Sequence, residues 1–391
     1  MKLLGFSLFS CVILANAMSA SAQQSAPRVL DSRWRGDDVS IQDISPEKVN
    51  YIAQLHCNSL RLHIDVDPAN HNKPLDQQVA PTEKDPLAPY AANLKLLDDV
   101  LPICRKDGIQ VVIAGGDIYG RKTDVFEKGT IEGSNIRVQL REFWTAMSAR
   151  YKDEPAIVAY DIRNEPTYAE SDKDSWWKQM LPECIAAIRK NDSTVWIVVE
   201  PYMAFADHFP EVPIIDDPKV IYSFHTYWPH GYTHQGVRFR QHRSQEDSLG
   251  AWTYPGNAPR VENPKQPIAA QKLSYWDKAA VLKTMQPVID FQKAHPGVRI
   301  LCGEFGVIRW APNNAVYLKD MIDLLEQQGW DWTFHSLGEW NGWDPSYAST
   351  DPNVGNRKDF TGGVVETDRL QVLKAGWALN VPPQKSTAAN N

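Results

Sequence analysis

The sequence has little cysteine, no excess of positive charge, and no long hydrophobic run beyond its first residues. It contains 5 cysteines in 391 residues, and none form a C-x-x-C pair, which argues against a zinc knuckle. The formal net charge of −7 argues against nucleic-acid binding, which needs a basic face. The G-x-S-x-G, phosphate-loop and H-E-x-x-H motifs are also missing. What remains is an acidic globular chain whose function must depend on other residues.

The first residues predict export. Residues 1–22 combine Lys2, an apolar run too short to span a membrane comfortably, and the small residues Ala20-Ser21-Ala22. This pattern indicates a secretory signal cleaved after Ala22; Cys11 resembles a lipoprotein site, but apolar residues follow it. We expect residues 23–391 to form one mature domain, secreted or periplasmic and free of the membrane. Four cysteines remain in this domain: Cys57, Cys104, Cys184 and Cys302. They are either buried free thiols, or some of them form one or two disulfides.

Apolar strand-like runs alternate with stretches of helical periodicity. Strands are expected near residues 35–41, 59–64, 109–117, 156–165, 195–201, 220–227, 299–305 and 330–337. A helix should begin at Ser45-Pro46, and a last helix should lie near residues 369–378. Repeated β-α order predicts parallel strands with helices outside. The pattern therefore predicts a single-domain α/β protein, a (β/α)8 TIM barrel, which typically takes about 250 residues before insertions. A doubly wound open sheet is the alternative.

The surplus length lies after the sixth expected strand, between Tyr227 and Leu273, where periodicity is weak. Loops this long are usually functional or disordered. His230 and His234 are spaced like zinc ligands on a helix, but the neighbouring proline and glycine favour a loop and argue against a metal. Four aromatic residues favour a structured loop that faces a ligand: Trp228, Tyr232, Trp252 and Tyr254.

Two glutamates stand at or near the ends of expected strands, Glu165 in AYDIRNEP and Glu304 in ILCGEFG. A single glutamate is usually a solvated surface charge. Glu165, however, precedes Pro166, where helix is disfavoured, and Glu304 follows Gly303, which leaves the approach uncrowded. Two carboxylates delivered from the ends of separate strands are what hydrolysis of a sugar-sugar bond requires.

Strand alternation predicts which other polar side chains point into the barrel. A barrel interior rarely tolerates many ionisable groups without partners or a task. The predicted interior sets are Arg61 with His63, opposite Leu60, Leu62 and Ile64; Ser223 with His225 and Tyr227; Asp161 with Arg163 and Glu165; and Cys302 with Glu304.

Four segments together resemble glycoside hydrolase family 5, the cellulase family of the retaining barrel clan. They are Arg61 in NSLRLHI, Asn164-Glu165-Pro166 after AYDIR, His225-Thr226-Tyr227, and Glu304 in CGEFG, in matching order over nearly the whole mature chain. The resemblance implies double displacement with net retention. Glu304 would be the nucleophile, and Glu165 would protonate the leaving oxygen and then activate water. Such carboxyl groups stand about 5–5.5 Å apart.

The resemblance also implies supporting roles. Arg61 and Tyr227 would hold the nucleophile ionised and oriented, because a cation and a hydroxyl donor both favour a carboxylate. Asn164 would bind the sugar 2-hydroxyl, and His225 would tune the acid/base residue. The acid must be protonated near neutral pH while the nucleophile stays charged.

Two positions depart from the family pattern. Members often carry a histidine at the end of the third strand, where this chain has Gly115-Gly116-Asp117. The tryptophan usual on the eighth strand aligns with His335, so that Trp340 or Trp343 would supply the surface on which a sugar stacks. These changes bear on specificity more than on chemistry.

We therefore expect a retaining, cellulase-like endoglycosidase acting on a β-linked glucan. A β-mannanase or other β-glycanase of the same family is the first alternative, and a non-catalytic carbohydrate-binding protein on the same barrel is the second. A third is a metal-dependent hydrolase using His63, His225, His230 and Asp117. Hydrolysis through two glutamates requires neither cofactor nor metal. The expected partner is a β-linked polysaccharide or oligosaccharide, and the protein is expected to be a monomer.

Overall fold

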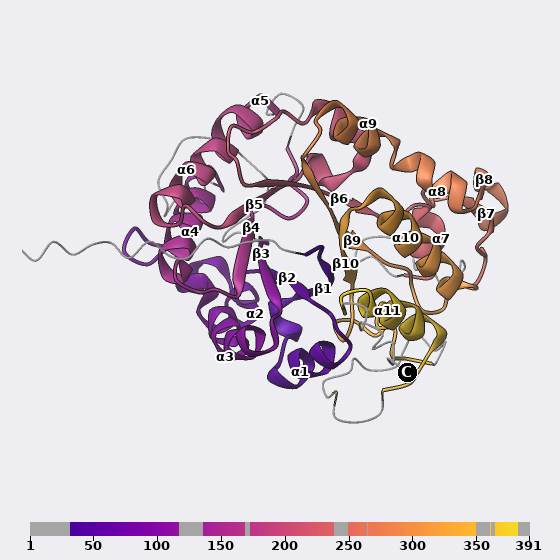
Figure 1. Ribbon diagram of the computed structural model, residues 1–391, viewed down its shortest axis with the longest axis horizontal. Coiled ribbons are helices and arrows are strands. Elements are labelled where there is room, and N and C mark those ends of the chain that lie inside the picture. The colour runs from indigo at the N-terminus through magenta and orange to yellow at the C-terminus, as the bar shows by residue number, and fades with distance from the viewer. Residues whose placement is uncertain are drawn as a thin grey trace, which may run out of the picture.

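In the computed structural model, eight parallel strands close into a barrel surrounded by helices (Figure 1). The structure describes residues 32–116, 136–168, 173–237, 249–263, 265–348, 360 and 364–381. The barrel strands are β1 (Arg35–Ser40), β2 (Ser59–Ile64), β3 (Gln110–Gly115), β4 (Ile157–Asp161), β5 (Trp196–Val199), β6 (Val220–Thr226), β9 (Arg299–Phe305) and β10 (Asp331–His335). Their order around the barrel is β1-β10-β9-β6-β5-β4-β3-β2. The predicted TIM barrel is confirmed, and the open sheet is excluded because the sheet closes on itself.

Helices lie outside the strands and begin and end at residues suited to these positions. At the start of α1, Ser45 Oγ accepts a hydrogen bond from the Lys48 N–H at 3.2 Å, as expected of an N-cap. Gly108 and Gly329, with φ of 71° and 75°, end α3 and α10 in the left-handed conformation. The helices are α1 (Pro46–Gln54), α2 (Pro68–His71), α3 (Ala91–Asp107), α4 (Ile136–Tyr151), α5 (Lys173–Ser175), α6 (Leu181–Asn191), α7 (His230–Thr233), α8 (Lys278–Thr284), α9 (Gln286–Ala294), α10 (Asn314–Gln328) and α11 (Asp368–Ala378).

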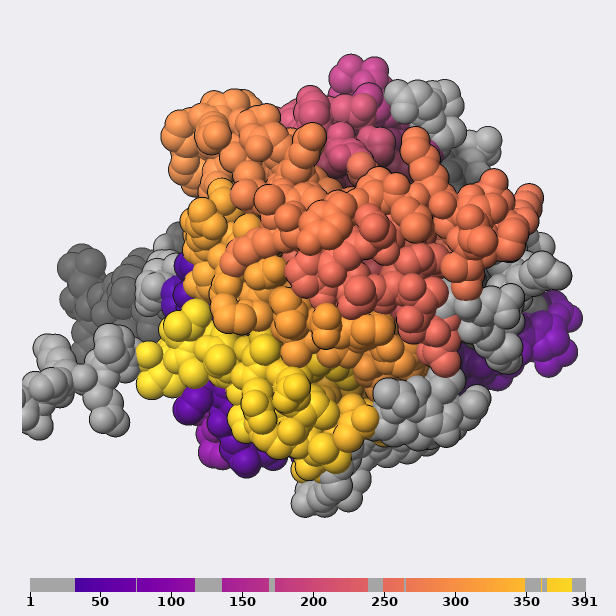
Figure 2. Space-filling model, turned by 90° about the vertical axis from the view of Figure 1, so that its right-hand side faces the viewer, coloured from indigo at the N-terminus to yellow at the C-terminus, as the bar shows by residue number. Residues whose placement is uncertain are grey.

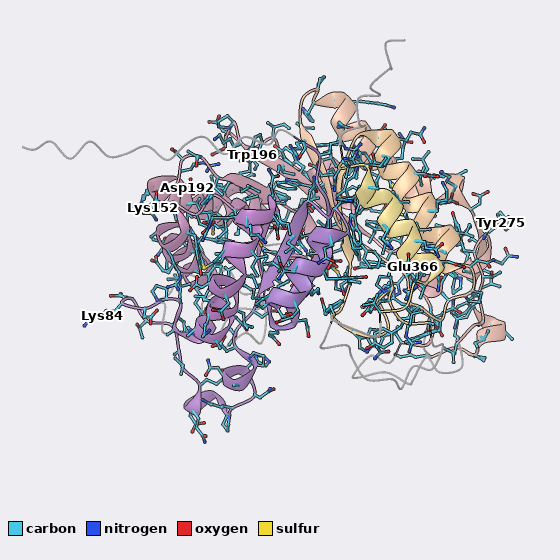
Figure 3. All side chains as sticks on the ribbon, turned by 60° about the horizontal axis from the view of Figure 1, so that its bottom comes forward. Lys84, Lys152, Asp192, Trp196, Tyr275 and Glu366 are labelled. Carbon is cyan, nitrogen blue, oxygen red and sulfur yellow. The ribbon has the colours of Figure 1, made fainter. Side chains whose placement is uncertain are left out.

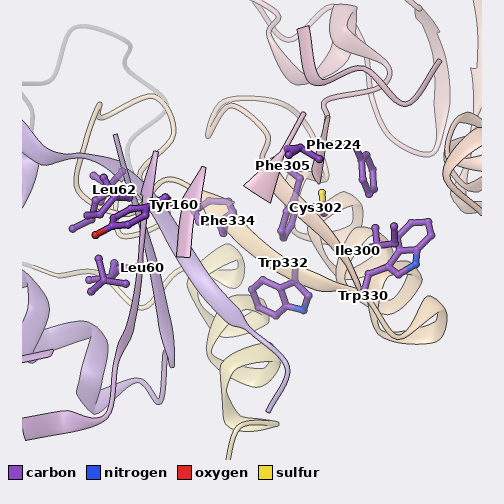
Figure 4. Close-up of a cluster of buried hydrophobic side chains, with 14 of the residues drawn as sticks. Leu60, Leu62, Tyr160, Phe224, Ile300, Cys302, Phe305, Trp330, Trp332 and Phe334 are labelled. Carbon is purple, nitrogen blue, oxygen red and sulfur yellow. The ribbon is translucent and has the colours of Figure 1, made fainter. Parts of the chain in front are cut away.

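Two hydrophobic layers leave the carboxyl end of the barrel to polar residues. Inside the barrel, Trp34, which precedes β1, packs with Val198 and Leu301 in a small buried cluster. Outside, apolar strand residues pack against the helices, and Figure 4 shows part of this layer, including Leu60 and Leu62 of β2. The predicted outward direction of these leucines is confirmed. The interior is a packed core, so substrate can approach only the polar end.

The segment after β6, predicted to be a long structured loop, contains regular elements in its described residues. It contains α7 and the antiparallel hairpin of β7 (Gly256–Pro259) and β8 (Leu273–Trp276), and it covers much of the face seen in Figure 2. Tyr232, Trp252 and Tyr254 are buried, and the rings of Tyr232 and Tyr254 lie 5.7 and 5.2 Å from that of Tyr317 on α10. The prediction that these three residues face a ligand is therefore wrong, because all three are buried and the two tyrosines pack the segment against α10. Trp228 remains half-buried.

The remaining expectations divide between described and undescribed residues. The predicted signal, residues 1–22, and Asp117 lie outside the described residues. Within the described ranges, no helix is both long and apolar enough to cross a membrane. The four cysteines of the predicted mature domain are free and buried, so the alternative of disulfides is wrong.

Candidate active site

Glu165 and Glu304 meet at the carboxyl end of the barrel. Glu304 belongs to β9, and Glu165 follows β4. One carboxylate oxygen of each lies within 4.8 Å of the other and of a ring nitrogen of His225. Two carboxyl groups from distant parts of the chain therefore share one site.

Glu304 owes its direction to a β-bulge. The pairing of β6 with β9 shifts register at Gly303, which is the extra residue. A Cβ atom at Gly303 would lie 2.8 Å from Ser223 Oγ and 2.9 Å from His225 Nε2, so any larger residue here would displace these side chains of the site. The prediction that Cys302 and Glu304 share a face is wrong: Cys302 packs in the outer core (Figure 4), and the bulge turns Glu304 into the site.

The Glu304 carboxylate receives a donor on each oxygen. Tyr227 Oη donates to Oε2 at 2.8 Å, and Arg61 Nη1 donates to Oε1 at 3.2 Å. Burial opposes ionisation, but the charge of His225 holds the pKa of Glu304 below its usual value. Burial and the adjacent carboxylate raise the pKa of Tyr227, which therefore stays a donor. Glu304 is thus ionised and oriented although its side chain is almost completely buried.

Glu165 lies in an irregular segment rather than on β4 itself. Its φ of 45° is unusual for a residue other than glycine, and its backbone N–H donates to Glu200 Oε2 at 2.8 Å. Its Oε1 lies 2.9 Å from His225 Nδ1, and its side chain is 37% exposed. Burial disfavours a charged imidazole, but Glu200 and Glu304 raise the pKa of His225 well above its usual value. The His225 imidazolium therefore donates to Glu165, which remains open to solvent.

Strand alternation fails beyond the end of β4. Asp161, the last residue of the strand, faces the interior as predicted and accepts hydrogen bonds from Arg61. Arg163 is buried, and its guanidinium donates to the carbonyl of Gly116, just after β3. Asn164 accepts from Arg61 and Glu165 lies against His225, so two consecutive side chains reach the site and the period of two no longer applies. The interior position of Arg163 stays a prediction.

Arg61 is completely buried and joins the carboxyl ends of several strands. Its Nη1 donates to Asp38 Oδ1 at 2.8 Å, and its Nε and Nη2 donate to Asp161 Oδ2 at 3.0 and 2.9 Å. Nη2 also donates to Glu200 Oε1 at 3.0 Å and to Asn164 Oδ1 at 2.8 Å. A guanidinium with five N–H donors can satisfy all these acceptors, which compensate its burial. Arg61 therefore holds Asn164 as well as the buried carboxylates.

Asp38 of β1 holds two histidines beside Glu304. Its Oδ1 lies 2.8 Å from His63 Nε2, and its Oδ2 lies 3.0 Å from His335 Nδ1. Burial disfavours both charged imidazoles, but Asp38 raises the pKa of His63 to about 9. Glu339 and Asp38 likewise raise the pKa of His335 to about 10. The His63 ring, 3.6 Å from Glu304 Oε1, is therefore positively charged at neutral pH.

Two buried carboxyl residues of the site, Asp38 and Glu200, were not among the predicted residues, and Asp161 was predicted only to face the interior. Glu200 follows the apolar run VWIVV just as Glu165 follows its strand, so the same signal could have identified it. For Asp38, the sequence could not show whether it or its neighbour Asp37 faces the site, since both are aspartates. The pairing of strands decides between them, because Asp38 faces Arg61 while Asp37 accepts the backbone N–H of Leu337.

Trp343, rather than Trp340, contacts the site. The Trp343 ring lies 5.8 Å from that of Tyr227 and 5.7 Å from that of His335. Trp340 is half-buried and packs 6.1 Å from Trp343 and 5.8 Å from Trp310. Its role as a sugar platform stays a prediction. His335 contacts Asp38 and Trp343, so it belongs to the wall of the site next to Glu304.

Two groups of side chains have the spacing of a metal centre, with ligand atoms within 4.8 Å of one another: Asp38, His63 and Glu304, and Glu165, His225 and Glu304. Hydrogen-bonded pairs account for part of this spacing, because His63 Nε2 lies 2.8 Å from Asp38 Oδ1 and His225 Nδ1 lies 2.9 Å from Glu165 Oε1. His230 lies in α7, not in the predicted loop, and its ring stacks 3.8 Å from that of His234.

Comparison with known proteins adds a family likeness to this geometry. A family model described as cellulase (glycosyl hydrolase family 5) matches residues 40–341. Endoglucanase C of Acetivibrio thermocellus is 29% identical over 246 residues, covering 60% of this chain and 70% of the relative. Cellodextrinase A of Ruminococcus flavefaciens is 26% identical over 220 residues, covering 54% of this chain and 57% of the relative.

Solved structures share the fold at low sequence identity. The cellulose synthase subunit Z of Clostridioides difficile superposes with a TM-score of 0.63 at 18% identity, covering 88% of this chain and 99% of that one. Cel5A of Thermotoga maritima in complex with cellobiose superposes with a TM-score of 0.62 at 17% identity, covering 87% and 97%. These likenesses establish the barrel architecture.

Proposed function

Because this chain belongs to the cellulase family, glycosyl hydrolase family 5, and is a glycoside hydrolase, we propose that it cleaves β-1,4-linked glucan by double displacement with retention. One observation carries the proposal: carboxylate oxygens of Glu165 and Glu304 lie within 4.8 Å of each other. Retaining enzymes hold their carboxyl groups about 5–5.5 Å apart, whereas inverting enzymes need about 6.5–9.5 Å to admit a water molecule.

The two glutamates take different roles. Glu304 attacks the anomeric carbon while the bond to the leaving oxygen breaks, and Glu165 gives its proton to that oxygen. Glu165 then removes a proton from water, which attacks the glycosyl-enzyme and releases Glu304. The donors from Arg61 and Tyr227 support the ionised nucleophile. The hydrogen bond between His225 Nδ1 and Glu165 Oε1 supports the acid/base role, because it orients the carboxyl group and leaves its other oxygen available for proton transfer.

The names of the relatives support a glucan, and they leave a mannan as the first alternative. Two of them are called endoglucanase C and cellodextrinase A. Thermotoga maritima Cel5A, however, has been solved with mannotriose as well as with cellobiose. A non-catalytic carbohydrate-binding protein is disfavoured by the two opposed carboxylates. We also propose export guided by residues 1–22, which detection of the protein in the medium or periplasm would test.

The test combines a polysaccharide panel with one active-site variant. The purified protein is assayed on cellulose derivatives, mixed-linkage glucan, xyloglucan and mannan, with analysis of product length. Glu304→Gln should reduce turnover by about 10⁴-fold or more while thermal unfolding stays as in the wild type. Glu366→Gln, at a surface glutamate labelled in Figure 3, is the control and should be fully active. Failure of an activated 2-fluoro-sugar to label Glu304 would support the non-catalytic alternative.

A further inference from the structure

Four consecutive backbone carbonyls after β10 each accept a hydrogen bond from one of two arginines. Arg309, which follows β9, donates to the first two, through Nε at 2.9 Å and through its backbone N–H at 2.8 Å. Arg369, on the last helix α11, donates to the other two, through Nη1 at 3.1 Å and through Nη2 at 2.6 Å. We call the four residues that carry these carbonyls the clamped segment: Asn341, Gly342, Trp343 and Asp344.

Both arginine side chains are almost completely buried. Arg369 Nη1 also donates to the carbonyl of Val307 at 3.2 Å, so that α11 is joined to the segments after β9 and after β10. A guanidinium carries five N–H donors, and its burial is costly unless these donors find acceptors. Because the acceptors here are backbone carbonyls, Arg309 and Arg369 fix the path of the main chain through the clamped segment.

The clamped segment carries Trp343, whose ring packs against the group that holds the candidate nucleophile. The Trp343 ring lies 5.8 Å from the ring of Tyr227. It also lies 4.9 Å from the ring of His234 and 5.7 Å from that of His335, which both adjoin Tyr227 at 5.0 and 6.5 Å. The Tyr227 hydroxyl donates to Glu304 Oε2 at 2.8 Å, and such a bond weakens steeply when its angle is disturbed.

We propose that Arg309 and Arg369 are positioning residues that hold the clamped segment, and with it Trp343, in place. The Trp343 ring in turn keeps the Tyr227 hydroxyl aligned with Glu304. Both arginines act through backbone carbonyls rather than through contact with substrate. The inference rests on the proposed function, in which Glu304 is the nucleophile, and it makes the reactivity of Glu304 depend on a side chain of an outer helix.

The test is a double-mutant cycle between Arg369 and Tyr227, assayed on the oligosaccharide that the wild type cleaves best. Arg369→Met, which removes the donors but keeps a long side chain, should lower kcat/KM about tenfold. In a Tyr227→Phe background the same change should lower kcat/KM by less than about twofold, because the hydroxyl that Arg369 positions is already absent.

A pH profile separates positioning from a loss of stability alone. A carboxylate that loses a well-placed donor has a higher pKa, and the nucleophile must be ionised. The acid limb of kcat/KM should therefore move up by about half a pH unit in Arg369→Met. The matched control is Arg189→Met, because Arg189 on α6 donates to the carbonyls of Asp192 and Val195, which precede β5 at the amino end of the barrel. This control should lower Tm but leave kcat/KM and the acid limb unchanged.

Equal losses of kcat/KM in the two backgrounds, or an acid limb that stays at the wild-type pH, would overturn the positioning role while leaving the proposed hydrolysis intact. A wild type inactive on every polysaccharide and oligosaccharide would instead refute the proposed function. If Arg369→Met fails to fold, Arg369→Lys provides the same comparison, since lysine keeps the charge but replaces the fork that reaches three carbonyls by a single nitrogen. Its loss should be about threefold and should likewise nearly vanish in the Tyr227→Phe background.

Discussion

Glu200 and Glu165 stand at the ends of neighbouring strands, and the backbone N–H of Glu165 donates to Glu200 Oε2 at 2.8 Å. The other oxygen of Glu200 lies 3.0 Å from Arg61 Nη2 and 3.0 Å from His225 Nε2. Burial opposes ionisation, yet His225 and Arg61 lower the pKa of Glu200 to about 2. One buried carboxylate therefore positions the backbone of Glu165 and keeps the histidine beside it charged.

Glu200→Gln should lower kcat about tenfold to a hundredfold with little change in KM, since Glu200 lies behind the groups that contact substrate. Glutamine retains an acceptor for the Glu165 N–H but removes the charge facing His225. The pKa of His225 should then fall, and the alkaline limb of the kcat/KM profile should move to lower pH. Ser223→Ala, which removes only the 3.3 Å hydrogen bond from Ser223 to Glu200, should leave that limb in place. A wild-type pH profile in Glu200→Gln would contradict this positioning role.

Glu165→Ala should impair poor leaving groups far more than good ones. A sugar alkoxide needs a proton as it departs, whereas a dinitrophenolate does not. We expect kcat on oligosaccharides to fall about 10²–10⁴-fold, and glycosylation by dinitrophenyl cellobioside to fall far less. Added azide should rescue the second step by forming a β-glycosyl azide. Similar losses on both substrates would show that Glu165 is not the acid.

His63 should make stability depend on pH between 6.5 and about 9. Its pKa is raised from 6.5 to about 9 in the folded state, since Asp38 outweighs burial. The stabilisation is fully present below pH 6.5 and is lost as the pH rises through 9, with a contribution of at most about 3 kcal/mol. Urea denaturation across this range should show a shallower decline for His63→Gln than for the wild type. His71→Gln, at an exposed position of α2, should behave like the wild type.

The cysteines should contribute no crosslink. Cys57, Cys104, Cys184 and Cys302 are free and buried, and burial raises their pKa values. Dithiothreitol should therefore leave Tm unchanged, and a thiol reagent should label the native protein slowly and the unfolded protein fast. A fall in Tm on reduction would reveal a disulfide and contradict this arrangement.

The barrel was predictable because its strands follow elementary periodicity. Arg61 and His63 face the interior opposite Leu60 and Leu62, as a period of two requires. The segment after β6 was harder to predict, because its sequence has little helical or strand periodicity. Tyr232, Trp252 and Tyr254 are nevertheless buried there as core residues. Local sequence could not show this for the two tyrosines, since Tyr317, whose ring packs against both, lies on α10, far along the chain.

The sequence by itself determined the strand order and the residues that bring Glu165 and Glu304 to the carboxyl end of one barrel. Tertiary structure decided where those side chains point and what surrounds them. The bulge at Gly303 and the φ of 45° at Glu165 break the strand period at the two positions that matter most. The buried network of Asp38, Arg61 and Glu200 forms only when the barrel closes and brings the carboxyl ends of β1, β2 and β5 together across its mouth. Each buried charge is stabilised only by the opposite charges beside it.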